Sequence, residues 1–265
     1  MPASRQGRNV TPRENAIALY MRGIRDGDPR AAVAEHTGAR YTQHSTGVAD
    51  GQEGFIAFFE PFLRRNPQRD IRVLRALQDG RKVFVHVHQS LNDGEAQWVT
   101  MDFFDSDGAG KIVEHWDVIA AYADRTPSGH SSIDGPTEIA DLSKTQANRE
   151  HVRRFVEACL IARETDRMAD FVSAAHYIEH NANWADGLDA MEMRYAAPDC
   201  ALSYQEAFHI VGEGNFVATL SRAREDGQDL CRADLWRMED DMIVEHWDTS
   251  EQVPPRADWA NSGKF

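Results

Sequence analysis

The sequence is poor in the features that mark exported, membrane-spanning and disulfide-stabilised proteins. Its three cysteines (Cys159, Cys200 and Cys231) all lie in the second half, and an odd, widely spaced set favours reduced thiols over a disulfide framework. No apolar run approaches the ~20 residues of a membrane span. The N-terminal residues 1–8 lack the apolar core of a secretory signal. These absences predict a cytoplasmic protein that does not bind membranes.

Positive charge is also scarce. The chain has 29 Lys and Arg against 43 Asp and Glu, a net charge of −14, and nearly all of the acidic excess lies after residue 121. An acidic chain without a basic stripe is a poor partner for nucleic acid or an anionic membrane. The sequence holds no Gly-x-Gly-x-x-Gly, no P-loop and no Gly-x-Ser-x-Gly motif, so it predicts no dinucleotide site, no phosphate cradle and no serine-hydrolase elbow.

What the sequence does contain is an internal repeat. Ile-Val-Glu-His-Trp-Asp at 112–117 recurs letter for letter at 243–248. Tyr-x-x-His at 41–44, followed by Ala-Asp-Gly at 49–51, recurs at 177–180 and 185–187. Two blocks that match in the same order predict a tandem duplication. Aligning Phe84-Val85 with Phe216-Val217 and Asp102 with Asp234 places Ala218 and Leu220 at the positions of His86 and His88, so we expect the second copy to lack that histidine pair.

Each copy reads as helices followed by a run of strands. A capping box at Thr11–Glu14 begins a helix to about residue 24, and Asp28-Pro29 begins a second. The pattern predicts a short strand at 41–44, a helix over 54–65 interrupted or shifted by Pro61, and strands near 70–78, 82–90, 96–105 and 111–119. In the second copy we expect helices near 147–163 and 166–175, and strands near 202–211, 214–223, 228–237 and 241–248. The predicted organisation is a first domain at 1–122, a linker rich in Pro, Gly and Ser at 123–146, and a second domain at 147–265. The last stretch, 253–265, is expected to be a tail that packs across the other copy.

The Tyr-x-x-His, Ala-Asp-Gly, His86-Val87-His88 and Glu-His-Trp-Asp segments resemble the SnoaL-like, polyketide cyclase and aldol-type branch of the nuclear transport factor 2-like superfamily. The resemblance covers nearly the whole chain, once per copy. It implies an α+β fold: two tandem cone-shaped, cystatin-like α+β barrels, each a curved antiparallel sheet wrapped around three helices. It further implies that the copies pack sheet to sheet as an intramolecular pseudo-dimer, with a further homo-oligomer left open.

Candidate catalytic residues gather on the last strand of the first copy. Side chains alternate along a strand, so His115 and Asp117 share one face and can form an acid–base pair. In the resembled cyclases an aspartate on a late strand moves a proton next to a carbonyl, and this role falls on Asp117. We expect burial to raise the basicity of Asp117. Oxygen-orienting or proton-relay candidates are the four residues Tyr41, His44, His86 and His88.

Alternatives remain open for these residues. Four histidines, His44, His86, His88 and His115, suit one cavity and could instead bind a metal, since His-x-His on a strand is a known ligand spacing. The favoured interpretation needs no metal and no cofactor. A second pocket is expected in the second copy, built from Asp248, His246, His180, Tyr177 and Arg222. The histidines could also be purely structural, each hydrogen-bonded to the backbone.

The sequence therefore predicts a cofactor-independent lyase or isomerase. The expected substrate is a small hydrophobic, aromatic or polyketide-like molecule, and the expected chemistry is aldol, retro-aldol or related proton transfer. The competing hypotheses are a non-catalytic module that binds a small molecule or a protein, and a metal-dependent enzyme that uses the histidines of the first copy.

Overall fold

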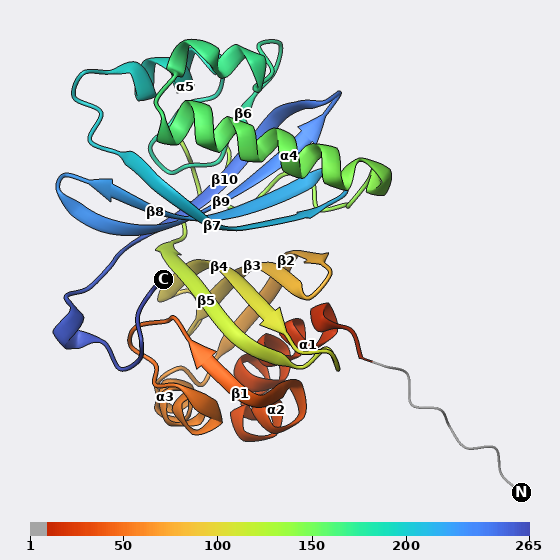
Figure 1. Ribbon diagram of the computed structural model, residues 1–265. Coiled ribbons are helices and arrows are strands. Elements are labelled where there is room, and N and C mark those ends of the chain that lie inside the picture. The colour runs from red at the N-terminus through yellow and green to blue at the C-terminus, as the bar shows by residue number, and fades with distance from the viewer. Residues whose placement is uncertain (1–9) are drawn as a thin grey trace, which may run out of the picture.

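The computed structural model describes residues 10–265 and has four layers, with two sheets face to face and helices on both outer sides (Figure 1). Residues 1–9, in which the sequence predicts no secretory signal, lie outside the described part. Each sheet has five strands, in the orders β1-β5-β4-β3-β2 and β6-β10-β9-β8-β7. The two orders are the same pattern repeated, and the α+β fold class predicted from the sequence is confirmed.

The first repeat runs from α1 to β5. Its helical part is α1 (Pro12–Ala18), a π-helical segment η1 (Leu19–Arg25), α2 (Pro29–His36) and α3 (Gly51–Arg65). Its strands are β1 (Thr37–Gln43), β2 (Arg69–Asp79), β3 (Lys82–Leu91), β4 (Ala96–Ser106) and β5 (Ile112–Ala121). The predicted capping box is present, since Thr11 and Glu14 bond each other's backbone N–H groups. Pro61 lies inside α3 without interrupting it.

The second repeat runs from η2 to β10. It contains η2 (Leu142–Lys144), α4 (Thr145–Phe155), the π-helical η3 (Val156–Ile161), η4 (Thr165–Asp170) and α5 (Leu188–Ala196). Its strands are β6 (Ile178–Glu179), β7 (Ser203–Glu213), β8 (Phe216–Glu225), β9 (Gln228–Glu239) and β10 (Met242–Gln252), and the short η5 (Arg256–Asp258) lies in the C-terminal tail. The predicted helix at 166–175 is only a short 3₁₀ segment, and the sequence reading missed α5. Within residues 10–265 no helix combines the length and apolar character needed to cross a membrane.

The sheets are mixed, which corrects the expectation of a purely antiparallel sheet. β1 pairs with β5, and β6 with β10, in parallel. The remaining pairs are antiparallel hairpin neighbours. Parallel neighbours need a connection longer than a hairpin, and here α3 and the strands β2 to β4 lie between β1 and β5 in the chain.

Register corrects the alignment of the two copies. Asp102 pairs with Val85, whereas its counterpart Asp234 pairs with Thr219. The β2–β3 and β7–β8 hairpins are therefore offset by two residues from the sequence alignment. Arg222 and not Leu220 occupies the position of His88, and Leu220 occupies that of His86.

The two sheets pack through one apolar cluster to which both contribute. Leu77, Phe84, Met101, Phe103, Trp116 and Val118 come from the first sheet, and Val211, Phe216, Ala218, Leu220, Cys231, Ala233, Leu235 and Trp247 come from the second. Separate clusters lie between each sheet and its own helices. Strands such as β3 are thus covered on both faces, which explains why Val83, Phe84 and Val85 are apolar without alternation. Burying each large side chain contributes about 1.5–3 kcal/mol.

Candidate functional site

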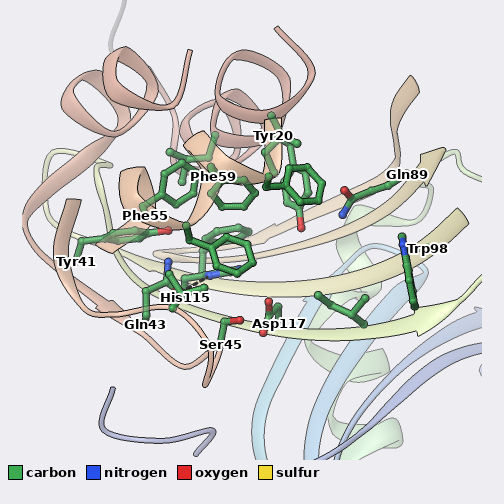
Figure 2. Close-up of a pocket in the computed structure, with 17 residues that line it drawn as sticks. Tyr20, Tyr41, Gln43, Ser45, Phe55, Phe59, Gln89, Trp98, His115 and Asp117 are labelled. Atoms are coloured by element: carbon green, nitrogen blue, oxygen red, sulfur yellow. Dashed lines mark hydrogen bonds between the residues drawn. The ribbon is translucent and has the colours of Figure 1, made fainter. Parts of the chain in front are cut away.

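A cavity of about 340 Å³ lies between the helices and the sheet of the first repeat. Aromatic rings form most of its wall; Gln43, Ser45, His115 and Asp117 lie near one another, and Gln89 lies apart from them beside Trp98 (Figure 2). The aromatic lining residues are Tyr20, Tyr41, Phe55, Phe58, Phe59, Phe62, Trp98 and Phe104, and the polar ones are Gln43, Ser45, Gln89, His115 and Asp117. This composition, apolar with a few convergent polar groups, is typical of small-molecule sites.

The helical wall depends on the π-helical segment η1. Leu19, Tyr20 and Ile24 all line the cavity, and π-helical turns occur frequently at functional sites. The Tyr20 phenol reaches across to β4, where its hydroxyl donates to Asp102 Oδ1 at 2.7 Å and lies 3.0 Å from Thr100 Oγ1.

His115 and Asp117 face this cavity together, as strand alternation predicts. Both ring nitrogens of His115 are engaged by the protein: Nδ1 lies 2.8 Å from Gln43 Oε1, and Nε2 lies 2.8 Å from Asp102 Oδ1. The ring also stacks on Phe104 at a centroid distance of 4.6 Å. His115 is thus held in one orientation by a chain of bonds from β1 to β4.

Asp102 is fully buried behind His115 and belongs to the site although it was not among the predicted residues. Thr100 donates to its Oδ2 at 2.8 Å. Burial raises the pKa of Asp102, and the bond from His115 only partly offsets this. The one sequence signal was the match of Asp102 with Asp234, a carboxylate kept in both apolar strands.

Asp117 corrects the expected basicity. Burial alone raises the pKa of Asp117, but the Lys264 ammonium and His115 outweigh it, so the pKa of this carboxyl lies below its usual range. Lys264 comes from the C-terminal tail, and its Nζ lies 3.0 Å from Asp117 Oδ1. Asp117 is therefore an ionised carboxylate in an apolar cavity and not a carboxyl tuned toward neutral pH.

Tyr41 also lines the cavity, with its phenol pointing inward (Figure 2). Burial raises the pKa of Tyr41, so its hydroxyl keeps its proton at neutral pH and can donate a hydrogen bond.

The other three predicted residues of the first copy do not line this cavity. His86 and His88 project from the opposite face of β3, toward the second sheet. His86 is buried against Arg75, at 3.2 Å, and burial followed by the charge of Arg75 lowers its pKa. His88 bonds Arg72 at 2.8 Å and Gln97 at 3.2 Å. They face away because the inward positions of β3 are taken by Val83, Val85, Val87 and Gln89.

His44 contacts the C-terminal tail on the face of the first sheet that lies opposite the cavity. Its ring is parallel to Trp116 at 4.6 Å, its Nε2 lies 3.0 Å from Glu114 Oε1, and its Nδ1–H donates to the Gly263 carbonyl at 2.7 Å. The four histidines of the first copy therefore do not converge. Among the described residues no group of three or more His, Cys, Asp and Glu side chains could hold a metal ion, so the metal alternative loses its ligand set.

In the second repeat the corresponding polar groups neutralise one another. His246 lies between two buried carboxylates, with Nδ1 2.9 Å from Glu179 and Nε2 3.1 Å from Asp234. Burial would lower the pKa of His246, but Glu179 and Asp234 raise it to about 10. Arg232, at the position of Thr100, forms buried ion pairs with both Asp234 and Asp248.

The remaining predicted residues of the second pocket are scattered. Tyr177 donates to Glu179 at 2.8 Å and is buried. His180 repeats the His44 arrangement, parallel to Trp247 at 4.6 Å with Nδ1–H donating to the Ser131 carbonyl at 2.8 Å. Arg222 lies over the Phe265 ring at 4.6 Å, on the face toward the first sheet. A second cavity of about 500 Å³ does reach His180, Asp248, Arg232 and Trp184, but it opens between the two repeats and includes Ala120 and Ala121 of β5.

Comparisons with known proteins give one family match and several similar solved structures. Residues 17–115 match the family model of the SnoaL-like domain. Similar solved structures include a candidate polyketide cyclase from Bacillus cereus ATCC 10987 (17% identity, 40% of this chain and 72% of the other, TM-score 0.36). They also include a candidate ketosteroid isomerase from Kribbella flavida DSM 17836 (14%, 42% and 84%, TM-score 0.37). A third is a candidate SnoaL-like polyketide cyclase from Jannaschia sp. CCS1 (18%, 44% and 91%, TM-score 0.36). A comparison with curated proteins gave no match.

Proposed function

We propose that the cavity of the first repeat, whose residues 17–115 match the SnoaL-like domain model, performs cofactor-independent acid–base chemistry on a small hydrophobic molecule. The observation that carries the proposal is a buried carboxylate, Asp117, at the polar end of an otherwise aromatic cavity. Packing does not require a charge there. Although burial raises the pKa of Asp117, Lys264 and His115 hold it below the usual range, so Asp117 is ionised at neutral pH and can accept a proton from carbon.

The cavity favours a flat, aromatic or polyketide-like substrate. Its wall of Phe and Trp rings suits a ligand with ring faces of its own. Four of the five polar groups, Gln43, Ser45, His115 and Asp117, lie near one another, which favours a ligand with an oxygen at that end. This arrangement supports a substrate with a carbonyl group beside an acidic C–H bond.

In the proposed step Asp117 removes the proton from the carbon next to the carbonyl. The C–H electron pair forms a C=C bond, the carbonyl π pair moves to oxygen, and Asp117 holds the proton for return to the same or another carbon. The Tyr41 hydroxyl, which keeps its proton at neutral pH, donates to the developing oxyanion. The same enolate serves double-bond migration or aldol and retro-aldol chemistry, so the proposal covers an isomerase or a lyase.

The chain Gln43–His115–Asp102–Tyr20 supports this step from the cavity wall. Because both His115 nitrogens are already bonded, His115 fixes the geometry beside Asp117. The proposed roles are thus Asp117 as base and Tyr41 as oxyanion donor, with His115 as the group between them.

The test uses 2-tetralone, an aromatic ketone with acidic α-protons, as a probe substrate. Exchange of these protons in D₂O is followed by proton NMR with wild type, Asp117→Asn and the matched variant Asp248→Asn of the second repeat. We expect Asp117→Asn to lose about 10²–10⁴-fold of the catalysed exchange and Asp248→Asn to retain it. If 2-tetralone perturbs cavity resonances but wild type exchanges no faster than Asp117→Asn, the domain is a binding module and the proposed chemistry is wrong.

A further inference from the structure

The C-terminal tail, residues 253–265, leaves the second sheet after β10 and runs along the first repeat (Figure 1). Its docking bonds go to the loop between β1 and α3. The Ala260 N–H donates to the Thr46 carbonyl at 2.8 Å, and Asn261 Nδ2 donates to the carbonyls of Ser45 at 2.6 Å and Val48 at 2.8 Å. Ser45 and Val48 both line the cavity of the first repeat. The tail therefore holds part of the cavity wall in place.

A hydrogen bond from His44 fixes the position of the end of the tail. This bond to the Gly263 carbonyl, together with the Trp116 stack, fixes the residue that follows. Lys264 is thereby buried, with only 1% of its surface exposed. Its Nζ lies 3.0 Å from Asp117 Oδ1 and 3.1 Å from Glu251 Oε2. A buried ammonium persists only when it is paired, and here its two partners are a cavity residue and a strand residue of the other repeat.

The second repeat provides an internal comparison. There the linker takes the place of the tail, since His180 bonds the Ser131 carbonyl as His44 bonds Gly263. The residue that follows is Ser132, which carries no charge. The cation for Asp248 comes instead from Arg232 on β9 of the same repeat. The docking is thus repeated, but the linker places a carboxylate beside its histidine, with Asp134 Oδ1 2.9 Å from His180 Nδ1, and the buried lysine is particular to the first repeat.

We propose that Lys264 is a positioning residue of the first site: the tail of the second repeat reaches into the first and holds Asp117 as an oriented, ionised carboxylate. This inference rests on the proposed function, in which Asp117 is the base. Lys264 does not itself line the cavity and acts through Asp117. The two repeats are then one functional unit, because the site of the first is completed by a residue of the second.

Several charged and titratable groups surround Asp117 and decide what removal of Lys264 does. They come from six elements besides the tail: Tyr20 of η1, Tyr41 of β1, Asp102 of β4, His115 of β5, Cys231 of β9 and Glu251 of β10. Lys264 and His115 are the cationic or potentially cationic members. Burial, Asp102 and Glu251 all oppose ionisation of Asp117. Without Lys264 the pKa of Asp117 must therefore rise.

The experiment measures the carboxyl titration of Asp117 by carbon NMR of the full chain labelled at the aspartate side-chain carbons, with Asp117→Asn identifying the resonance. Lys264→Met and Lys264→Gln remove the charge, Lys264→Arg retains it, and Lys144→Met removes an exposed lysine as a control. We expect the two neutral variants to raise the Asp117 midpoint by about 2 pH units or more, and Lys264→Arg and Lys144→Met to leave it low. A folded neutral variant in which Asp117 titrates as in wild type overturns the proposal.

Exchange of 2-tetralone gives a second readout that a merely structural role would not produce. In Lys264→Gln the rate should fall only below the raised Asp117 midpoint and stay within about three-fold of wild type at pH 8. An equal loss at every pH marks a structural role and contradicts the inference. If wild type shows no exchange at all, the proposed function fails, while the carboxyl titration still decides whether Lys264 controls Asp117.

Discussion

Replacing Arg232 with methionine should destabilise the protein far more than removing an exposed arginine from the same sheet. The Arg232 side chain is 4% exposed and is paired with Asp248 and, at 3.0 Å, with Asp234. Methionine fills a similar volume but leaves both carboxylates without this cation. Within residues 10–265, His246 is then the cation in hydrogen-bond contact with Glu179 and Asp234, while Asp248 keeps only the neutral donor Asn181.

The magnitude follows from the burial of these partners. Breaking a buried ion pair by removing one member costs about 3–5 kcal/mol, because a charge stays buried without compensation. For a chain of this size, about 3–5 kcal/mol corresponds to a fall in Tm of roughly 6–20 °C. The matched control is Arg224→Met on β8, where the Arg224–Asp229 pair is about half exposed and its loss should cost less than about 1 kcal/mol.

The loss should also depend on pH in a defined direction. In wild type, burial raises the pKa of Asp234, but Arg232 and His246 outweigh it and hold this pKa below its usual value. The stability that Asp234 contributes is present above the unfolded pKa and is lost as the pH falls through the folded one. In Arg232→Met the pKa of Asp234 rises, so its protonation at acid pH removes an uncompensated buried charge and reduces the loss of stability. The gap to wild type should be widest near pH 7 and narrow below about pH 4.

Urea denaturation of both variants at pH 7 and pH 4, followed by circular dichroism, measures these differences. A loss for Arg232→Met no larger than that for Arg224→Met would refute the reasoning that buried charges of the second repeat compensate one another. A gap that widens toward acid pH would refute the assignment of Asp234 as the relieved group.

Two further predictions concern single histidines. His88→Ala should leave 2-tetralone exchange within about two-fold of wild type, because His88 contacts Arg72 and Tyr122 on the face of β3 opposite the cavity; a ten-fold loss would mean that His88 contributes to the reaction after all. His246 should remain protonated at pH 8, because Glu179 and Asp234 raise its pKa to about 10; imidazole resonances that titrate near pH 6.5 and disappear in His246→Gln would contradict this.

The sequence predicts the fold well because the repeat and its alternating strands are strong signals. The shared face of His115 and Asp117 follows from strand alternation alone. The orientation of β3 does not, because Val83, Phe84 and Val85 are buried on both faces and the pattern is apolar throughout. His86 and His88 therefore could be assigned to a common face but not to the correct one.

Other errors have equally local causes. The two-residue slip that equated Leu220 with His88 came from aligning Phe84 with Phe216, although the hairpins pair Asp79 with Lys82 and Glu213 with Phe216. Lys264 lies 147 residues from Asp117 along the chain, and no periodic pattern connects a tail lysine with a strand carboxylate at that separation. The packing of the tail on the other copy could be predicted from the sequence, but the ion pair of Lys264 with Asp117 could not.

The same His-Trp-Asp strand therefore has different consequences in the two repeats, and the difference lies in three neighbouring positions. Where the first repeat has Gln43, Thr100 and Lys264, the second has Glu179, Arg232 and Ser132. In the second repeat Glu179 bonds His246 and Arg232 pairs with Asp248, so these charges are compensated inside the same repeat and stabilise it. In the first, uncharged Gln43 and Thr100 surround His115 and Asp102, and the cation of Asp117 comes from outside the barrel. That leaves the interior free for a ligand, because no arginine has to occupy it. Duplication thus allows one repeat to keep an open cavity while the other provides the packing surface and the tail that complete it.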